Sequence, residues 1–409
     1  MGQQPSAHTL LDLAINAGWR RNETKSTRVK ATYVDFAATA PLRPQVRATI
    51  QAFLAEEWGN ASSLHGHGHR ARMALEEARE QISRLLGVKV EEIIFTSGAT
   101  EANNLALLGW MRQQPEGSHL IVSAVEHPSV WEAAEALTYE GYRMDLAPVD
   151  RHGRLDLERL STLIRPETSL LSVMAVNNEV GTIQPIAEVA ALPRTFKLHV
   201  DAVQSNWVGW PDLEGIDMLS LSAHKLGGPV GSGCLFLRQG LRLQPLLLGG
   251  SQEDHRRAGT SNVLSAVALA QAMQVSHQQR AEECQLLIAL RQALEEGLRK
   301  LEGAHLLAVD GQRSPHVSSW YFDGVTAESL LVLLDLEGIS ASSGSACSSH
   351  SLEPSRVLLA MGLSPQQSRG LIRFSLGFSS TLQDVERILE VMPRLVAQVR
   401  RKAIPSVAG

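Results

Sequence analysis

Several short apolar segments restrict this chain to a small set of folds. Each is a continuous run of strand-forming residues, and they lie at 93–96, 119–123, 170–176, 198–200 and 218–221. Continuous runs of this kind are typical of strands buried on both faces. Segments with helical spacing separate them, and strands that alternate with helices form a parallel sheet covered on both sides. The sequence therefore predicts an α/β fold with a mostly parallel sheet between two layers of helices.

The length and a change in pattern predict two domains. A chain of 409 residues exceeds what one hydrophobic core usually spans. After Asn262 the pattern changes to long amphipathic helices, and one of them opens at 283–290 with apolar positions three and four residues apart. We therefore predict a large domain at 31–265 and a smaller domain at 266–409. Residues 1–30 are expected to form an extension of uncertain order.

The composition excludes several classes of function. The 38 basic and 43 acidic residues give a net charge of -5, so there is no electrostatic reason to expect nucleic acid or an anionic membrane as a partner. Charged residues interrupt the apolar runs well before membrane-spanning length, and no signal peptide is expected. The three cysteines, Cys234, Cys284 and Cys347, form no C-x-x-C pair. That excludes a disulfide framework or zinc knuckle, and it predicts a soluble protein of a reducing, cytoplasmic compartment.

The turn at 96–100 predicts an anion-binding site. It follows a strand and precedes a helix expected over 101–114. The unpaired backbone N–H groups and the positive end of the helix dipole favour a phosphate, and the Thr100 hydroxyl adds a donor. The alternative interpretation is simple capping of the helix by Ser97 or Thr100.

Asp201 and Lys225 each follow a predicted strand. A carboxylate at the C-terminal end of a parallel strand faces the ligand crevice. There Asp201 would keep a pyridine nitrogen protonated, while Lys225 would hold an aldehyde as an imine. With the phosphate site, these residues occur in the order that a pyridoxal phosphate enzyme needs. The alternatives are a helix cap for Asp201 and a solvated surface charge for Lys225.

Six sequence strings, taken together and in order, resemble the cysteine desulfurases. They lie at 97–101 (Ser-Gly-Ala-Thr-Glu), 126–127 (Glu-His), 176–181 (Val-Asn-Asn-Glu-Val-Gly), 199–205 (His-Val-Asp-Ala-Val-Gln-Ser), 222–225 (Ser-Ala-His-Lys) and 343–347 (Ser-Gly-Ser-Ala-Cys). The resemblance is to the NifS/IscS-like group of the class-V aminotransferase family, which are fold-type I pyridoxal phosphate enzymes, and it covers about 33–399. It implies a large domain with a seven-stranded, mostly parallel sheet and a smaller α/β C-terminal domain.

The resemblance also implies roles for single residues. Lys225 would bind pyridoxal 5'-phosphate covalently, Asp201 would pair with its pyridine nitrogen, and His127 would stack on its ring and assist proton transfer. Arg373 would clamp the substrate carboxylate, a task for a planar bidentate donor, unless it is a surface arginine. The other implied contacts are Ala99, Thr100, Ser222 and His224 at the phosphate, Gln204 and Asn178 at the phenolic oxygen, Asn178 also at the substrate, and Thr260 at the phosphate of the neighbouring subunit's cofactor. The role of Thr260 implies a homodimer.

Cys347 would supply the chemistry that distinguishes this group. The segment 342–351 is small, polar and without periodicity, which predicts a mobile loop. A thiolate, favoured by exposure and by the nearby His350, would take sulfur from L-cysteine, leaving L-alanine and a persulfide on Cys347. The persulfide would pass to a sulfur-acceptor protein, either an iron-sulfur scaffold or a thiolation enzyme. Cys234 and Cys284 are expected to be small buried hydrophobic side chains.

Other interpretations remain open at this point. A selenocysteine lyase or a cysteine C–S lyase would use the same cofactor site, although the serine-rich Cys347 segment favours a desulfurase. A non-catalytic sulfur-carrier or assembly subunit would keep the fold alone. Two positions depart from the family pattern, with Asp254 where arginine is frequent and Ala61 where proline is usual. The histidines at 65–69 suggest a metal, but alternating glycines and the lack of paired cysteines favour a flexible loop without one.

Overall fold

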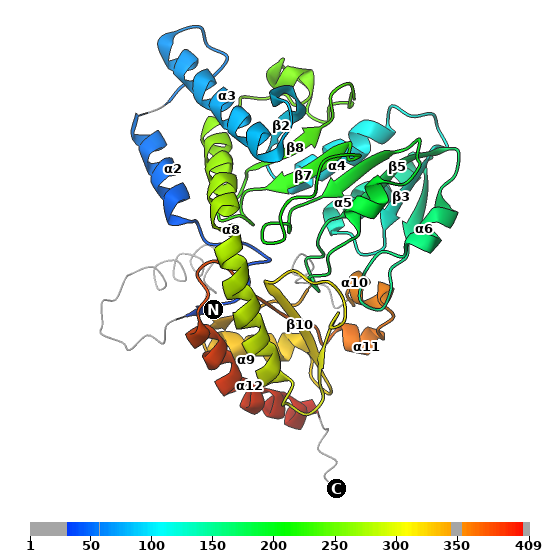
Figure 1. Ribbon diagram of the computed structural model, residues 1–409, viewed down its shortest axis with the longest axis vertical. Helices are drawn as coiled ribbons and strands as arrows, with labels where there is room; N and C mark the ends of the chain where they lie inside the picture. Colours follow the sequence, from blue (N-terminus) through cyan, green and yellow to red (C-terminus); the bar gives the residue numbers. More distant parts are fainter. Residues whose placement is uncertain (1–30, 57, 345–353, 404–409) are drawn as a thin grey trace, which may run out of the picture. The chain divides into compact units, whose positions relative to one another are not determined.

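The computed structural model describes residues 31–56, 58–344 and 354–403. The chain divides after Ala31, and the description below concerns the part from Thr32 onward (Figure 1). None of the helices in these described ranges has the length and apolar character needed to cross a membrane.

A seven-stranded sheet lies at the centre of the larger part of the fold. Its strands, in spatial order, are β2 (Ile93–Thr96), β8 (Gly233–Leu237), β7 (Met218–Ser222), β6 (Lys197–Asp201), β5 (Thr168–Met174), β3 (His119–Ser123) and β4 (Arg143–Ala147). The strands from β7 to β4 pair in parallel, and β8 runs antiparallel to both of its neighbours. The prediction of a mostly parallel α/β sheet is confirmed.

Neighbouring residues of one strand pack into cores on opposite faces of the sheet. Leu120 and Val122 of β3 join one core, which also holds residues of α4 (Ala99–Met111) and α5 (Pro128–Tyr139). Ile121, between them, joins the other core. Because both faces are buried, these strands have no polar side, which explains the continuous apolar runs in the sequence.

The second face of the sheet is covered by a larger set of helices. They are α2 (Pro44–Glu56), α3 (Gly66–Leu86), α6 (Leu157–Leu163), α7 (Ile186–Ala190) and the first half of α8 (Val263–Leu298), and the short helices η1 (Val90–Glu92) and η2 (Gln252–His255) lie on the connections. The helix α3 ends at Gly87, whose φ of 68° is costly for residues with a Cβ atom. The strand β4 was not predicted. It lies at the edge of the sheet, and its polar and apolar residues do not alternate clearly enough to indicate a strand.

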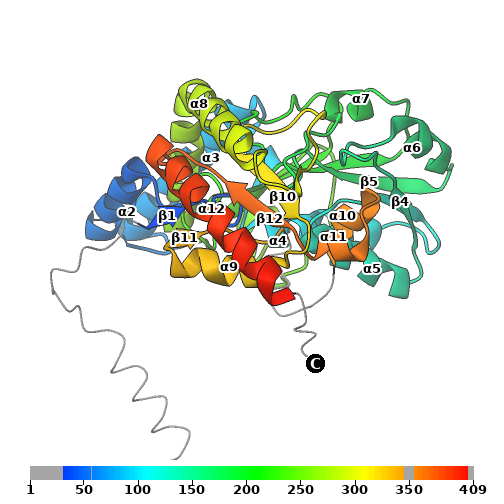
Figure 2. The same cartoon turned by 90° about the horizontal axis from the view of Figure 1, so that it is seen from below.

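A second core lies around three antiparallel strands. These are β9 (Ala304–Leu306), β10 (Val317–Phe322) and β12 (Ile372–Ser375), with α9 (Ala327–Leu336) and α12 (Leu382–Ala403) packed beside them (Figure 2). The short helices α10 (Arg356–Ala360) and α11 (Pro365–Ser368) precede β12. Near the other end of the chain, β1 (Thr32–Tyr33) pairs in parallel with β11 (Ile339–Ser340), and Val34 and Phe36 are buried in this second core.

The helix α8 joins the two cores. It has 36 residues, about 54 Å in length, and it begins where Asn262 accepts a hydrogen bond from the Ser265 amide. Leu269 and Met273 belong to the sheet core, whereas Leu287 and Leu294 belong to the second core. The domain boundary near residue 265 remains a prediction, and α8 runs across it without a break.

Candidate active site

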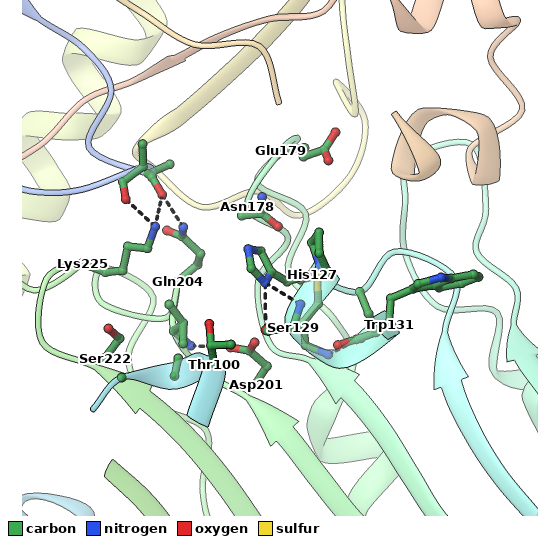
Figure 3. Close-up of a pocket in the computed structure, with 18 of the residues that line it drawn as sticks. Thr100, His127, Ser129, Trp131, Asn178, Glu179, Asp201, Gln204, Ser222 and Lys225 are labelled. Carbon is green, nitrogen blue, oxygen red and sulfur yellow. Dashed lines mark hydrogen bonds between the residues drawn. The ribbon is translucent and has the colours of Figure 1, made fainter. Parts of the chain in front are cut away.

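A cavity of about 640 Å³ opens at the carboxyl ends of the sheet strands (Figure 3). In open parallel sheets this edge is where ligands bind, because the loops that follow the strands meet there. Side chains that follow β3, β5, β6 and β7 line it together with the start of α4 and with Arg373 of β12.

The start of α4 offers unshared backbone donors to this cavity. Gly98 precedes the helix with φ of 152°, a conformation that residues with a Cβ atom rarely adopt, and no side chain caps the helix there. The alternative of capping by Ser97 or Thr100 is therefore not what the structure shows. Ser222 and His224 line the same cavity as Thr100. Backbone amides, hydroxyls and an imidazole in this arrangement suit a phosphate group.

Lys225 also lines the cavity and lies in a turn after β7. Its Nζ donates hydrogen bonds to the carbonyl oxygens of Ala37 at 2.7 Å and Ala38 at 2.6 Å. The next residue is fixed as well, since the Leu226 carbonyl accepts from Nε of the buried Arg43 at 2.9 Å. Lys225 is thus a half-buried, oriented amine, and the interpretation as a solvated surface charge is excluded.

Asp201 is a buried carboxylate whose two oxygens both accept hydrogen bonds. Oδ1 accepts from the Val203 amide at 3.0 Å, and Oδ2 accepts from Nδ2 of Asn103, a fully buried residue of α4, at 2.8 Å. Gln204, one turn further on, donates from Nε2 to the Ala37 carbonyl at 2.8 Å. The Asp201 carboxylate is therefore held by α4 and by the loop after β6, and Asp201 lines the cavity.

His127 caps the start of α5. Its Nδ1 accepts the Ser129 amide at 3.1 Å and lies 2.8 Å from the Ser129 hydroxyl, while Pro128 occupies the first helical position. Burial lowers the pKa of His127, and Lys225 acts in the same direction, whereas the nearby Asp201 opposes the shift. The imidazole is consequently neutral at physiological pH.

Arg373 is buried, so it is not a surface arginine. Nη2 contacts Asp35 Oδ1 at 2.7 Å and Nη1 donates to the Asn178 carbonyl at 2.8 Å. Its Nε has no partner among the described residues, although the residue lines the cavity. A guanidinium fixed on one side with donors remaining is suited to a carboxylate ligand.

Two further carboxyl groups are buried in the cavity wall. Burial raises the pKa of Glu126 to about 8, although Ser123 and the Met174 amide donate to it. Burial also raises the pKa of Glu179, which accepts a hydrogen bond from the Ser355 hydroxyl at 2.5 Å. Both groups are therefore protonated at higher pH than an exposed carboxyl.

Comparison with known proteins identifies the family. The class-V aminotransferase model matches residues 32–388. The cysteine desulfurase IscS of Dictyoglomus turgidum is 41% identical over 379 residues, which cover 91% of this chain and 96% of that protein. The cysteine desulfurase NifS of Azotobacter vinelandii is 41% identical over 374 residues, covering 90% and 93%.

The chain belongs to the cysteine desulfurase group of the class-V aminotransferase family. Among solved structures, a NifS-like protein is 34% identical, with a TM-score of 0.84, and the match covers 90% of this chain and 100% of that one. Both the resemblance seen in the sequence and the predicted fold are thereby confirmed.

The cavity brings together most of the residues predicted for a cysteine desulfurase. The predicted residues that line it are Ala99, Thr100, His127, Asn178, Asp201, Gln204, Ser222, His224, Lys225 and Arg373. Thr260 instead lines a second cavity, which shares Ser97 and Gly231 with the first. Cys347 lies outside the described residues. By donor chemistry the set fits pyridoxal 5'-phosphate, with amides and hydroxyls for the phosphate, a carboxylate for a protonated pyridine nitrogen and an amine for the aldehyde.

Sequence reasoning missed several residues of this site. Asn103 and Ser129 support Asp201 and His127 from behind, and the Trp131 side chain forms part of the wall with the Arg356 guanidinium 4.7 Å from its ring centre. The only available signal was helical spacing, which places Asn103 one turn beyond Thr100.

The remaining cysteines and the histidine cluster have structural surroundings. Cys234 is fully buried in β8 and its pKa is raised to about 12 by burial, which agrees with the prediction of an inert hydrophobic side chain. Cys284 is half-buried and donates to the Trp207 carbonyl. In the histidine cluster, His65 caps α3, and His67 stacks on Trp58 with ring centres 4.2 Å apart.

Proposed function

We propose that this protein is a pyridoxal phosphate-dependent cysteine desulfurase, which takes sulfur from L-cysteine and yields L-alanine and a persulfide on Cys347. The observation that carries the proposal is the convergence of Lys225, Asp201, His127 and Arg373 on one cavity, in a chain 41% identical to proteins named cysteine desulfurases. A subunit that had kept only the fold would have no reason to retain a fixed lysine opposite a buried aspartate.

The cofactor would be held by the two sides of the cavity. The α4 amides, Thr100, Ser222 and His224 would bind its phosphate, Asp201 its pyridine nitrogen, Gln204 and Asn178 its phenolic oxygen, and Lys225 its aldehyde carbon. When bound, pyridoxal phosphate supplies an electron sink that acidifies the α C–H bond of an amino acid and weakens the bond from its β carbon to sulfur.

The substrate would be oriented by charge and by a mobile proton. Arg373 would hold the carboxylate of cysteine through the N–H groups that Asp35 and Asn178 leave over. Lys225 Nζ would then move the proton at the substrate α carbon, and His127 would hold a proton near the same atom.

Sulfur transfer would be completed by Cys347. Its thiolate attacks the substrate sulfur, a sulfur-sulfur bond forms, and the carbon-sulfur bond breaks with its electron pair left on the β carbon, which takes up a proton to become the alanine methyl group. Although Cys347 lies outside the described residues, Gly344 before it and Pro354 after it both line the cavity. The described residues on both sides of the segment that contains Cys347 therefore support this proposal.

Finer aspects of the function follow from the same family membership. We propose that the protein is a homodimer in which Thr260 contacts the neighbouring subunit's cofactor, that it works in the cytoplasm, and that it delivers sulfur to an iron-sulfur scaffold or a thiolation enzyme. Ser97 and Gly231 line both cavities, so the cavity that contains Thr260 adjoins the one in which the phosphate would bind. This supports a role for Thr260 close to a cofactor phosphate.

The test is to purify the protein, record the yellow absorption of bound pyridoxal phosphate, add L-cysteine with a thiol reductant, and measure sulfide and alanine together. Equal amounts of the two products are expected. A colourless protein that gives neither product contradicts the proposal, and much faster turnover of selenocysteine would instead identify a selenocysteine lyase.

Cys347→Ala tests the assignment of the nucleophile. The variant should keep the yellow absorption and lose more than about 99% of persulfide formation, because neither of the two described cysteines, Cys234 and Cys284, lines the cavity. Cys284→Ala is the matched control, since it removes a half-buried thiol outside the cavity and should retain wild-type turnover. Undiminished sulfur transfer by Cys347→Ala would remove Cys347 from the mechanism.

A further inference from the structure

A chain of hydrogen bonds joins the two residues that would contact the cofactor ring. Asn103 Nδ2 lies 2.8 Å from Asp201 Oδ2 and also 2.8 Å from Ser129 Oγ. Ser129 Oγ lies 2.8 Å from His127 Nδ1. Three elements, α4, β6 and α5, thus contribute to one connection behind the cavity, and Figure 3 shows Asp201, Ser129 and His127 along it.

The direction of every hydrogen bond in this chain is fixed by chemistry. A carboxylate only accepts, so the amide of Asn103 must present its NH₂ group to Asp201 and to Ser129. A hydroxyl that accepts from Asn103 has its own hydrogen left for His127 Nδ1. The Ser129 backbone N–H also donates to that atom at 3.1 Å. Since Nδ1 accepts twice, the proton of the neutral imidazole is on Nε2.

The burial of Asn103 argues that this connection is not there for stability. The residue is fully buried on a helix whose neighbours are apolar, and its Oδ1 has no partner among the described residues. A buried acceptor without a partner costs about 1–3 kcal/mol, a cost that leucine at the same position would avoid. The Asn103 amide is instead oriented so that its NH₂ group donates to both Asp201 and Ser129.

We propose that Asn103 and Ser129 are positioning residues, which fix Asp201 and lock His127 as the tautomer that carries its proton on Nε2. His127 then acts in its neutral form as a hydrogen-bond donor at Nε2, and the removal of the substrate α proton falls to Lys225. Among the described residues, the charged and titratable groups that act on His127 include Asp201, Lys225 and His224. The consequence for turnover rests on the proposed function, whereas the tautomer does not.

The test compares three variants of the cofactor-bound protein by NMR of ¹⁵N-labelled histidine. The wild type should show a protonated Nε2 and an unprotonated Nδ1 for His127. The ¹⁵N signals of His127 are identified by their absence from the spectrum of His127→Gln. Ser129→Thr keeps the hydroxyl and should match the wild type. Ser129→Ala should raise the apparent pKa of His127 by roughly 0.5–1 pH unit, which is the effect of one lost hydrogen bond to Nδ1. Asn103→Leu should raise it in the same direction by less, because it leaves the Ser129 hydroxyl in place and removes only the donor that orients this hydroxyl.

Combining the substitutions separates a relay from two independent effects. In the Ser129→Ala background, Asn103→Leu should shift the His127 signals no further, because the relay is already cut. In turnover with L-cysteine, we expect Ser129→Ala and Asn103→Leu to lower kcat about tenfold and to leave KM nearly unchanged. Asn103→Ala replaces Asn103→Leu if the leucine variant does not fold.

Three outcomes would overturn the proposal. They are a proton on Nδ1 in the wild type, unchanged ¹⁵N shifts and pKa of His127 in Asn103→Leu and Ser129→Ala, or additive shifts in the double variant. A protein that shows the expected tautomer and shifts but releases neither sulfide nor alanine would disprove the desulfurase function and leave the relay intact.

Discussion

Glu126 is a single carboxyl group that couples folding to pH. It is buried beside the cavity, its Oε2 has no partner among the described residues, and burial raises its pKa to about 8 from 4.5. The folded protein therefore keeps a proton that the unfolded chain has lost at neutral pH. The contribution of this group to stability is complete below about pH 4.5 and is lost as the pH rises through about 8.

Glu126→Gln is expected to remove this pH dependence. Glutamine keeps the acceptor for Ser123 and the Met174 amide but has no proton to lose. The melting temperature of the variant, minus that of the wild type, should rise by roughly 2 °C or more between about pH 5 and pH 8.5. Calorimetry at both pH values checks this, and a difference that falls with pH would mean that Glu126 is ionised in the folded protein.

The residues of the site differ in how far the sequence alone could reveal them. Lys225, Asp201 and Thr100 follow strands or open a helix, so strand-forming runs in the sequence were enough to place them at one edge of the sheet. Asn103 and Ser129 carry no such signal, because an asparagine inside one helix and a serine at the start of another have ordinary structural roles. Their function depends on the packing of α4 against α5, which no local pattern records.

At the scale of the elements, a buried ion pair joins Arg43, the residue just before α2, to Glu283 of α8. Arg43, which is 1% exposed, pairs with Glu283 through Nη1 at 2.6 Å and Nη2 at 2.9 Å, and Trp207 Nε1 donates to the same carboxylate at 2.8 Å. The same guanidinium binds the Leu226 carbonyl beside Lys225. Helix packing and the position of the lysine therefore depend on one side chain.

Arg43→Met is expected to destabilise the protein by about 3–5 kcal/mol, because it leaves the Glu283 carboxylate buried without its charge partner. The control is Arg112→Met, which breaks the surface pair with Glu140 and should cost about 1 kcal/mol or less. Denaturant unfolding followed by tryptophan fluorescence measures both. Equal losses of unfolding free energy in the two variants would show that the buried pair stabilises the protein no more than the surface pair does.

Element positions were predictable where one physical cause dominates. The strands β2 and β3 match their predicted runs because burial on both faces favours continuous apolar residues, with polar residues only at the strand ends. The strands β9 and β12 were not predicted, since they lie in a small antiparallel sheet whose register depends on partners far away in sequence. Helical structure after Asn262 was predicted, but the helix expected to open at 283–290 is instead the interior of α8, which runs unbroken from Val263 to Leu298 and joins the two cores.

The two cores should unfold together because α8 contributes side chains to both. Hydrogen exchange measured at increasing denaturant should show β6, in the sheet, and β12, in the second core, losing protection at the same concentration. A linker at the domain boundary would allow separate transitions, whereas a continuous helix makes the loss of one core expose the other. Midpoints that differ by more than experimental error would show that the two cores unfold separately, which requires α8 to come apart between Met273 and Leu287.

The burial of Val34 and Phe36 in the second core sets an order of events on the ribosome. Domains generally fold as they emerge, from the N-terminus onward. Here β1 leaves the ribosome before the whole seven-stranded sheet, and its partner β11 and the strand β12 follow only after that sheet. The sheet between them can form in the meantime, so the nascent chain carries an exposed apolar segment around β1 until β11 and β12 emerge and is expected to need a chaperone during that interval.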